Sequence, residues 1–362
     1  MLRYLFALLL LVHALIHLMV FAKAFKLAEI KQLTTPISKP AGLLWLLAAV
    51  LFIGAGILFL VQQQAWWIPA AVALVISQTL ITLDWHDAKA GTIANVIVLI
   101  VTIVAYGSWN LNNMVEKKVS NMLSENEIAS TNIVNNDMLA PLPPPVQTWL
   151  LHSGIVGKPQ VHTVHLKQKG FMRMKPDTDK WIPTTAEQYF TIDKPAFIWK
   201  VNMEMMPLLP VAGRDQFVHG KGQMLIKAFS LFNIVNQADE KIDQGALQRY
   251  LAEICWFPSA ALSPYITWQP IDDYSAKASM TYNSVSGSLV FCFNKDGELI
   301  RCIADRYKGG GSEATLEKWV VDTKRYAVMN GIRMPVQSEA TWKLKEGDYT
   351  WYKLEITSIE YQ

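Results

Sequence analysis

Four long runs of apolar residues, separated by short polar stretches, occupy the first third of the chain. A helix rises about 1.5 Å per residue, so about 20 apolar residues cross the roughly 30 Å hydrocarbon core of a membrane. Each run has about this length, and none contains a charged residue. The pattern therefore predicts four transmembrane helices within residues 1–114, over 4–22, 41–61, 66–83 and 91–111.

From residue 161 onward apolar and polar positions alternate, which is the period of a β-strand with one buried face. About ten such segments follow one another, with turn signals such as Asn330-Gly331 between them. Between Gln244 and Cys255 the apolar residues recur at helical spacing instead. We expect residues 141–362 to form a mainly antiparallel β domain, a curved sheet or half-barrel with one packed helix. Residues 115–140, rich in asparagine, glutamate and serine, are expected to be a linker.

Composition and charge agree with a membrane part followed by a soluble part. Hydrophobic residues make up 51% of the 362 positions and charged residues 17%. The loops after the first and third helices carry lysines 23, 26, 31, 39 and 89, against Arg3, Lys117 and Lys118 on the opposite side. The positive-inside rule then predicts a multi-pass protein of the inner membrane with an extracytoplasmic C-terminal domain. The net charge of +3 comes without a basic stripe, which argues against a nucleic-acid partner.

A few polar residues interrupt the predicted membrane helices: His13, His17, Gln78 and Asn95. His17, Gln78 and Asn95 are expected at a similar depth, and His13 lies one helical turn deeper on the same face as His17. Polar groups in hydrocarbon are costly unless paired, which favours a hydrogen-bonded cluster that fixes helix packing. A ligand or proton-handling site with Asp84 and His86 at its rim is an alternative, and a metal or haem site is another.

The soluble part contains no recognisable catalytic, cofactor or metal motif. Cys255, Cys292 and Cys302 are an odd number without a CxxC pair, and buried free thiols are favoured over a bridge between the last two. Glu253 could act as a general acid, but an ion pair with Arg249, one helical turn earlier, explains it more simply.

Four stretches carry a resemblance to a known group of proteins: GRDQFVHGKGQM, LQRYLAEICWFPSA, WQPIDDYSAKASMTY and VFCFNKDGELI. Together they resemble an uncharacterised bacterial family in which a multi-helix membrane region precedes a C-terminal domain of unknown function. That resemblance implies no catalytic residues. The order of strands, one helix and further strands is also similar to the half-open barrel of periplasmic lipoprotein carriers, at the level of fold alone.

The leading expectation is a membrane-anchored extracytoplasmic protein that binds a membrane lipid, an acylated molecule or another apolar ligand without covalent chemistry. Large apolar side chains near the predicted helix are the expected ligand contacts: Trp199, Met205, Phe229, Trp256 and Phe257. One alternative is an accessory subunit that docks on a partner membrane protein. Another is a membrane enzyme that uses Glu253 or Asp272. No cofactor is expected.

Overall fold

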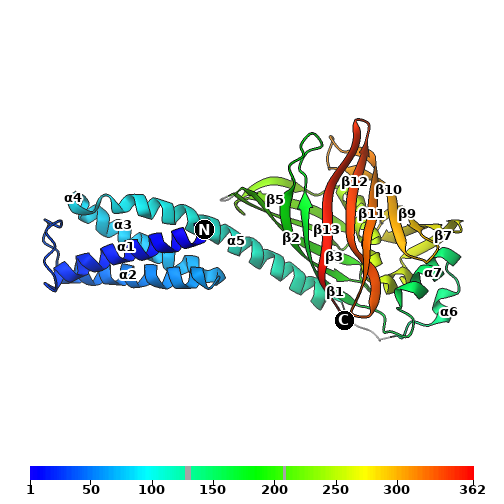
Figure 1. The fold of residues 1–362 in the computed structure, drawn as a ribbon, viewed down its shortest axis with the longest axis horizontal. Coiled ribbons are helices and arrows are strands. Elements are labelled where there is room, and N and C mark those ends of the chain that lie inside the picture. The colour runs from blue at the N-terminus through cyan, green and yellow to red at the C-terminus, as the bar shows by residue number, and fades with distance from the viewer. Residues whose placement is uncertain (127–131, 207–208) are drawn as a thin grey trace. The chain divides into compact units, whose positions relative to one another are not determined.

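The computed structural model describes residues 1–126, 132–206 and 209–362, and the chain forms two units, Met1–Asn113 and Met114–Gln362. The first unit is helical and the second is built on a large sheet (Figure 1). Each unit has hydrophobic clusters of its own.

Helices α1 (Leu2–Ala24), α2 (Lys39–Leu60), α3 (Trp67–Leu83) and α5 (Gly91–Ser124) dominate the first unit. With the 3-10 turn η1 (Gln64–Trp66) joined to α3, they are the four helices of the described chain that are long and apolar enough to cross a membrane. Alanines such as Ala14, Ala49 and Ala73 are fully buried where the helices meet, because small side chains allow close approach. The short helix α4 (Trp85–Ala88) connects α3 to α5.

Helix α5 is longer than the sequence pattern predicts. It continues past Leu111 to Ser124, through the first part of the predicted linker. No glycine or proline interrupts this stretch, and Val115, Val119 and Met122 are buried at helical spacing. The residues of this stretch that suggested a linker, Glu116, Ser120, Asn121 and Ser124, therefore occupy the exposed side of a helix. Residues 127–131 of the predicted linker lie outside the described residues.

Two short helices, α6 (Asn136–Leu139) and α7 (Pro144–Ser153), precede a sheet that has 13 strands in the described part of the chain. Every neighbouring pair is antiparallel. The strands are β1 (Thr163–Met172), β2 (Ile182–Thr191), β3 (Ala196–Met206), β4 (Leu209–Val218), β5 (Lys221–Ala228), β6 (Phe232–Gln237), β7 (Ile266–Asp272), β8 (Ser275–Tyr282), β9 (Val285–Phe293), β10 (Leu299–Lys308), β11 (Thr315–Met329), β12 (Ile332–Leu344) and β13 (Gly347–Tyr361).

The strand order is β6-β5-β4-β3-β2-β1-β13-β12-β11-β10-β9-β8-β7, so β6 and β7 are the two edges although they follow one another in the chain. The segment between them must cross the sheet. It contains α8 (Glu240–Glu253) and the 3-10 turns η2 (Ile254–Trp256) and η3 (Pro258–Leu262). Helix α8 contacts β4 and β5 from one half of the sheet and β8, β9 and β10 from the other. The expected fold, four apolar helices followed by a curved antiparallel half-barrel with one packed helix, is confirmed.

Three details of the sheet differ from the sequence pattern. Residues 216–229 alternate as one strand would, but they contain a hairpin turn, because His219 and Gly220 have φ angles of 55° and 78° and join β4 to β5. The sequences of β6 and β7 show no clear alternation of apolar and polar residues, because both are edge strands with mostly exposed side chains. Pro270 in β7 is tolerated because an edge strand has one side without ladder hydrogen bonds.

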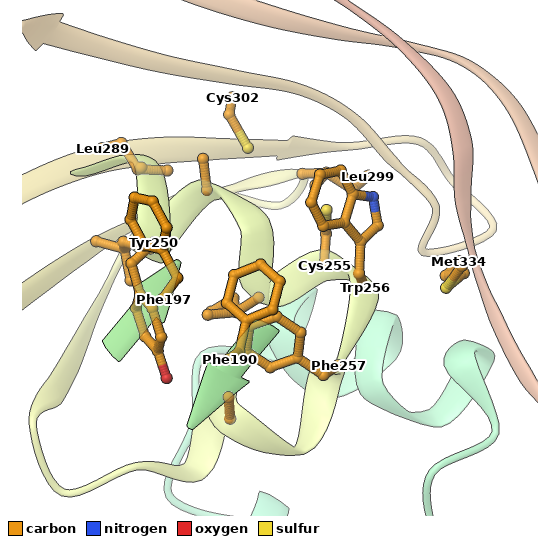
Figure 2. Packing of buried hydrophobic residues seen from close by; sticks show 14 of the residues in the cluster. Phe190, Phe197, Tyr250, Cys255, Trp256, Phe257, Leu289, Leu299, Cys302 and Met334 are labelled. Carbon is orange, nitrogen blue, oxygen red and sulfur yellow. The ribbon is translucent and has the colours of Figure 1, made fainter. Parts of the chain in front are cut away.

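The main core of the second unit lies where α8, η2 and η3 meet the sheet (Figure 2). Asp239 caps α8 by accepting hydrogen bonds from the backbone N–H groups of Lys241 (2.8 Å) and Ile242 (3.0 Å). Phe190, Phe257 and Tyr250 are buried against one another, with ring centroids 4.7 Å apart for the two phenylalanines. This packing holds the helix at a fixed position over the sheet.

Candidate functional site

A cavity of about 440 Å³ lies between the sheet and α8 in the second unit. Trp199 of β3, Trp319 of β11, Trp342 of β12 and Tyr352 of β13 contribute aromatic rings to its wall. Trp256 of η2 closes it from the helical side. The volume falls within the roughly 300–1,000 Å³ of small-molecule sites, and the wall is mostly apolar, as is usual for them.

A row of aromatic residues crosses the cavity wall from strand to strand. Trp319 pairs with Trp342 in the register of β11 and β12, and Trp342 pairs with Tyr349 in that of β12 and β13. All three are at least 90% buried, with exposed fractions of 5%, 7% and 7%. Directly opposed residues of adjacent strands share a face, so their rings form one continuous apolar surface.

Arg249 of α8 is a buried cation with two carboxylate partners. Its Nη1 lies 2.7 Å from Asp215 Oδ2, and its Nε lies 2.8 Å from Glu253 Oε1. The guanidinium also lies 4.5 Å from the Trp199 ring and 5.0 Å from the Phe197 ring. Burial lowers the pKa of Arg249, but the two carboxylates more than offset this, and the net shift is upward. This ion triad ties the helix to β3 and β4.

Arg306 of β10 is a second guanidinium in the cavity wall. Its carbon lies 4.7 Å from the Trp319 ring and 5.6 Å from the Trp342 ring. Its Nε donates a hydrogen bond to the backbone oxygen of Gly245 at 3.0 Å. Burial lowers the pKa of Arg306 to about 10, which leaves the group protonated at neutral pH. No local pattern marks Arg306, since its partners come from three other elements: Gly245 of α8, Trp319 of β11 and Trp342 of β12.

The expected ligand contacts separate into two groups. Trp199 and Trp256 line the cavity. Phe257 is fully buried in the core beside Phe190, and Met205 packs against that core. Phe229 occupies the turn between β5 and β6 with a φ of 53°. None of these last three is among the described residues that line the cavity.

The carboxylates considered for an enzyme lie in different surroundings. Glu253 lines the cavity, but both its oxygens are engaged, one by Arg249 and the other by Gln188 Nε2 at 2.7 Å. Burial raises the pKa of Glu253, an effect that the Arg249 guanidinium opposes. Asp272 is the exposed last residue of β7, where it accepts a hydrogen bond from the backbone N–H of Tyr274 at 2.9 Å.

The three cysteines are free thiols. In the register of β9 and β10, Cys292 lies opposite Arg301 rather than opposite Cys302. Successive side chains of a strand point to opposite faces, so Cys302 points away from the face of Cys292. This geometry does not favour a bridge across the hairpin.

The polar residues of the four-helix unit form one hydrogen-bonded network. His13 Nε2 lies 2.8 Å from Asn95 Oδ1, and His17 Nε2 lies 2.9 Å from Ser77 Oγ. Asn95 Nδ2 donates to Ser77 Oγ and to Gln78 Oε1, each at 3.0 Å. Ser77, which the sequence pattern did not single out, therefore stands at the centre of the network. Its small side chain carries no hydropathy signal, and only its neighbours reveal its role.

The network can be satisfied with both histidine rings neutral. His17 Nδ1 lies 2.8 Å from the backbone oxygen of His13 and must donate to it, which leaves His17 Nε2 to accept from Ser77. His13 Nε2 then donates to Asn95 Oδ1. Hydrogen bonds between these side chains suit an apolar surrounding, where each unsatisfied polar atom is costly.

We expect Asn95→Leu to destabilise the helical unit by about 1–2 kcal/mol, because it removes the hydrogen bonds that Asn95 makes with His13, Ser77 and Gln78. Denaturation of the purified protein in mixed micelles measures this loss. Asn112→Leu on the same helix is the control, since the Asn112 amide has only a 3.5 Å contact with Gln64 Oε1. Equal stability of the two variants would show that the network does not fix helix packing.

Comparison with other proteins bears on the second unit. No curated protein matches the chain. A solved structure, a LolA superfamily protein from Nitrosomonas europaea, is similar at 10% identity over 60% of this chain and 93% of that chain, with a TM-score of 0.31. A likeness of that size supports no conclusion about function. The model of a family of unknown function, DUF6544, matches residues 132–354, which include the cavity and α8. The expected resemblance to such a family is thus confirmed, and the chain belongs to the family of unknown function DUF6544.

Proposed function

We propose that the protein is a membrane-anchored binding protein whose β unit takes up a lipid or another apolar ligand outside the cytoplasm. The observation that carries this proposal is the aromatic cavity between the sheet and α8. Trp199 and Trp256 are the proposed ligand contacts from opposite walls. The protein performs no covalent chemistry in this proposal, and α8 with η2 acts as the cover of the cavity.

Burial of an acyl chain supplies the binding energy in this proposal. Each buried methylene contributes about 0.8 kcal/mol, so a chain that fills part of the cavity is retained without charged contacts. The anchor consists of the four long apolar helices, which have the length and composition of membrane spans. The lysine-bearing loops between these helices favour a cytoplasmic location for the loops and an extracytoplasmic location for the β unit.

Val321→Trp is expected to reduce ligand retention about tenfold or more. Val321 lines the cavity from β11 and is only partly buried, so a larger side chain there extends into the cavity volume. Displacement of two methylene groups of the ligand costs about 1.6 kcal/mol, which corresponds to roughly 15-fold in affinity. Native mass spectrometry of the full-length protein, extracted gently from its own membranes, measures the bound fraction.

Val328→Trp is the matched control, because it makes the same substitution on the same strand at a side chain that is 62% exposed. It should retain as much ligand as the wild type. An empty wild-type protein, or equal retention by both tryptophan variants, would contradict the proposed function.

A further inference from the structure

The charges of the cavity wall are unbalanced. Its acidic residues are Asp215 and Glu253, and Arg249 already pairs with both. Arg173, Lys241, Arg306 and Lys308 line the same cavity. The wall is therefore net positive after its internal ion pair is counted.

Several cations of this wall, Arg214, Lys241 and Lys308 among them, have no carboxylate within 4.0 Å in the described part of the chain. Arg306 is another, and its guanidinium lies against the Trp319 and Trp342 rings of the aromatic row. No ion pair within 4.0 Å includes it among the side chains that the structure describes. Its Nε is used by Gly245, and the remaining donors of the guanidinium fork have no hydrogen-bond acceptor in the described residues. A guanidinium has five N–H donors in a planar arrangement that matches a carboxylate or phosphate.

The surroundings of Arg306 keep it accessible from the cavity. Its side chain is partly exposed, whereas Trp319 and Trp342 beneath it are buried. Gly245, the α8 residue above it, leaves room for the guanidinium: a Cβ at that position would lie 3.3 Å from Arg306 Nε. The positive group thus stands at the β10 end of the aromatic row that runs through Trp319 and Trp342 to Tyr349.

An unpaired charge in an apolar cavity is costly to fold, and a ligand of opposite charge removes that cost. We propose that Arg306 binds the anionic head group of the ligand, and that the ligand is a long-chain amphiphile whose head is a carboxylate or a phosphate monoester. Its chain lies along the aromatic row. This inference rests on the proposed function and adds the chemical class of the ligand to it.

The test compares head groups on one chain length. Radiolabelled hexadecanoate, hexadecyl phosphate, hexadecanol and hexadecyltrimethylammonium are bound to the full-length protein in nonionic detergent. The wild type should prefer the two anionic probes to hexadecanol by roughly 10- to 100-fold, the range for a hydrogen bond to a charged group. The cationic probe should bind weakest. The more tightly bound of the two anionic probes shows whether the head is a carboxylate or a phosphate.

Arg306→Gln should abolish the preference for an anionic head and leave the affinity for hexadecanol within about threefold, because the apolar wall is unchanged. Arg306→Lys should keep part of the preference, since it keeps the charge but not the planar fork. Arg301→Gln is the control on the same strand, as Arg301 is exposed, pairs with Asp322 and does not line the cavity. It should behave as the wild type.

Two results would overturn the inference while leaving the proposed function intact: equal binding of hexadecanol and the anionic probes by the wild type, or an unchanged anionic preference in Arg306→Gln. Failure of all four probes to bind would contradict the proposed function itself, and the head-group inference with it. If Arg306→Gln does not fold, the wild-type preference and the Arg306→Lys variant still decide the question.

Discussion

Arg249→Met is expected to destabilise the β unit by about 3–5 kcal/mol, the cost of leaving buried carboxylates without their cation. Asp215 and Glu253 lie 2.7 and 2.8 Å from the guanidinium. Their side chains are only 17% and 12% exposed, so water does not replace the lost partner. For a unit of this size the loss lowers Tm by roughly 6–20 °C. Thermal unfolding of the full-length protein in detergent, followed by tryptophan fluorescence, measures the shift.

Two further variants separate the charge effect from the loss of packing around Arg249. The triple variant Arg249→Met, Asp215→Asn, Glu253→Gln removes the unpaired charges and should recover most of the lost Tm. Arg325→Met removes an exposed ion pair with Glu355 and should change the free energy of unfolding by less than about 1 kcal/mol. If the triple variant is no more stable than Arg249→Met, the charges are not the cause.

Phe257→Ala should cost about 3–5 kcal/mol of unfolding free energy, which is typical of removing a fully buried phenylalanine. Phe257 is 0% exposed, and its ring packs with those of Phe190 and Tyr250, whose centroids are 4.7 and 6.0 Å away (Figure 2). The cavity left by the truncation cannot collapse without moving η2 and η3. The same thermal unfolding experiment measures the loss.

Phe171→Ala, on a β1 side chain that is 50% exposed, is the control and should leave Tm within about 2 °C. The sequence pattern predicted that Phe257 contacts the ligand, whereas the structure places it in the core. A ligand contact affects ligand retention, and a core residue affects Tm. A Phe257→Ala variant as stable as the wild type that loses its ligand would support the ligand contact and contradict the structural role.

Much of the architecture follows from local patterns. The four apolar runs predict helices because membrane-spanning length is a property of each segment alone. Apolar and polar residues alternate in segments such as β12 and β13, and this pattern predicts strands. Asn330-Gly331 marks a hairpin because both positions adopt a positive φ. The α8 helix is recognisable by its apolar spacing between Asp239 and Pro258. The hairpin at His219-Gly220 is not, since His-Gly is not among the dipeptides that typically mark a two-residue hairpin turn.

The candidate site depends on contacts that local patterns do not contain. Trp199 and Trp256 can be proposed from the sequence because they are large apolar residues. No local pattern predicts that Arg306, Trp319 and Trp342 lie together. They meet because of the register of β10, β11 and β12. In the helical unit, likewise, Ser77 acquires its role from His17 and Asn95 on two other helices.

Local patterns were enough to predict the kinds of element and their order: four apolar helices, then strands with one helix between them. Hydrophobic period and length are read within a single segment, so they need no knowledge of neighbours. The pairing of β1 with β13, the edge positions of β6 and β7, and the crossing of α8 between them depend on contacts between distant segments. The alternation of side chains predicts which residues of a strand share a face. It does not predict which strand lies next to it in the sheet, because that depends on long-range pairing. The cavity, the Arg249 triad and the unpaired Arg306 all result from that pairing.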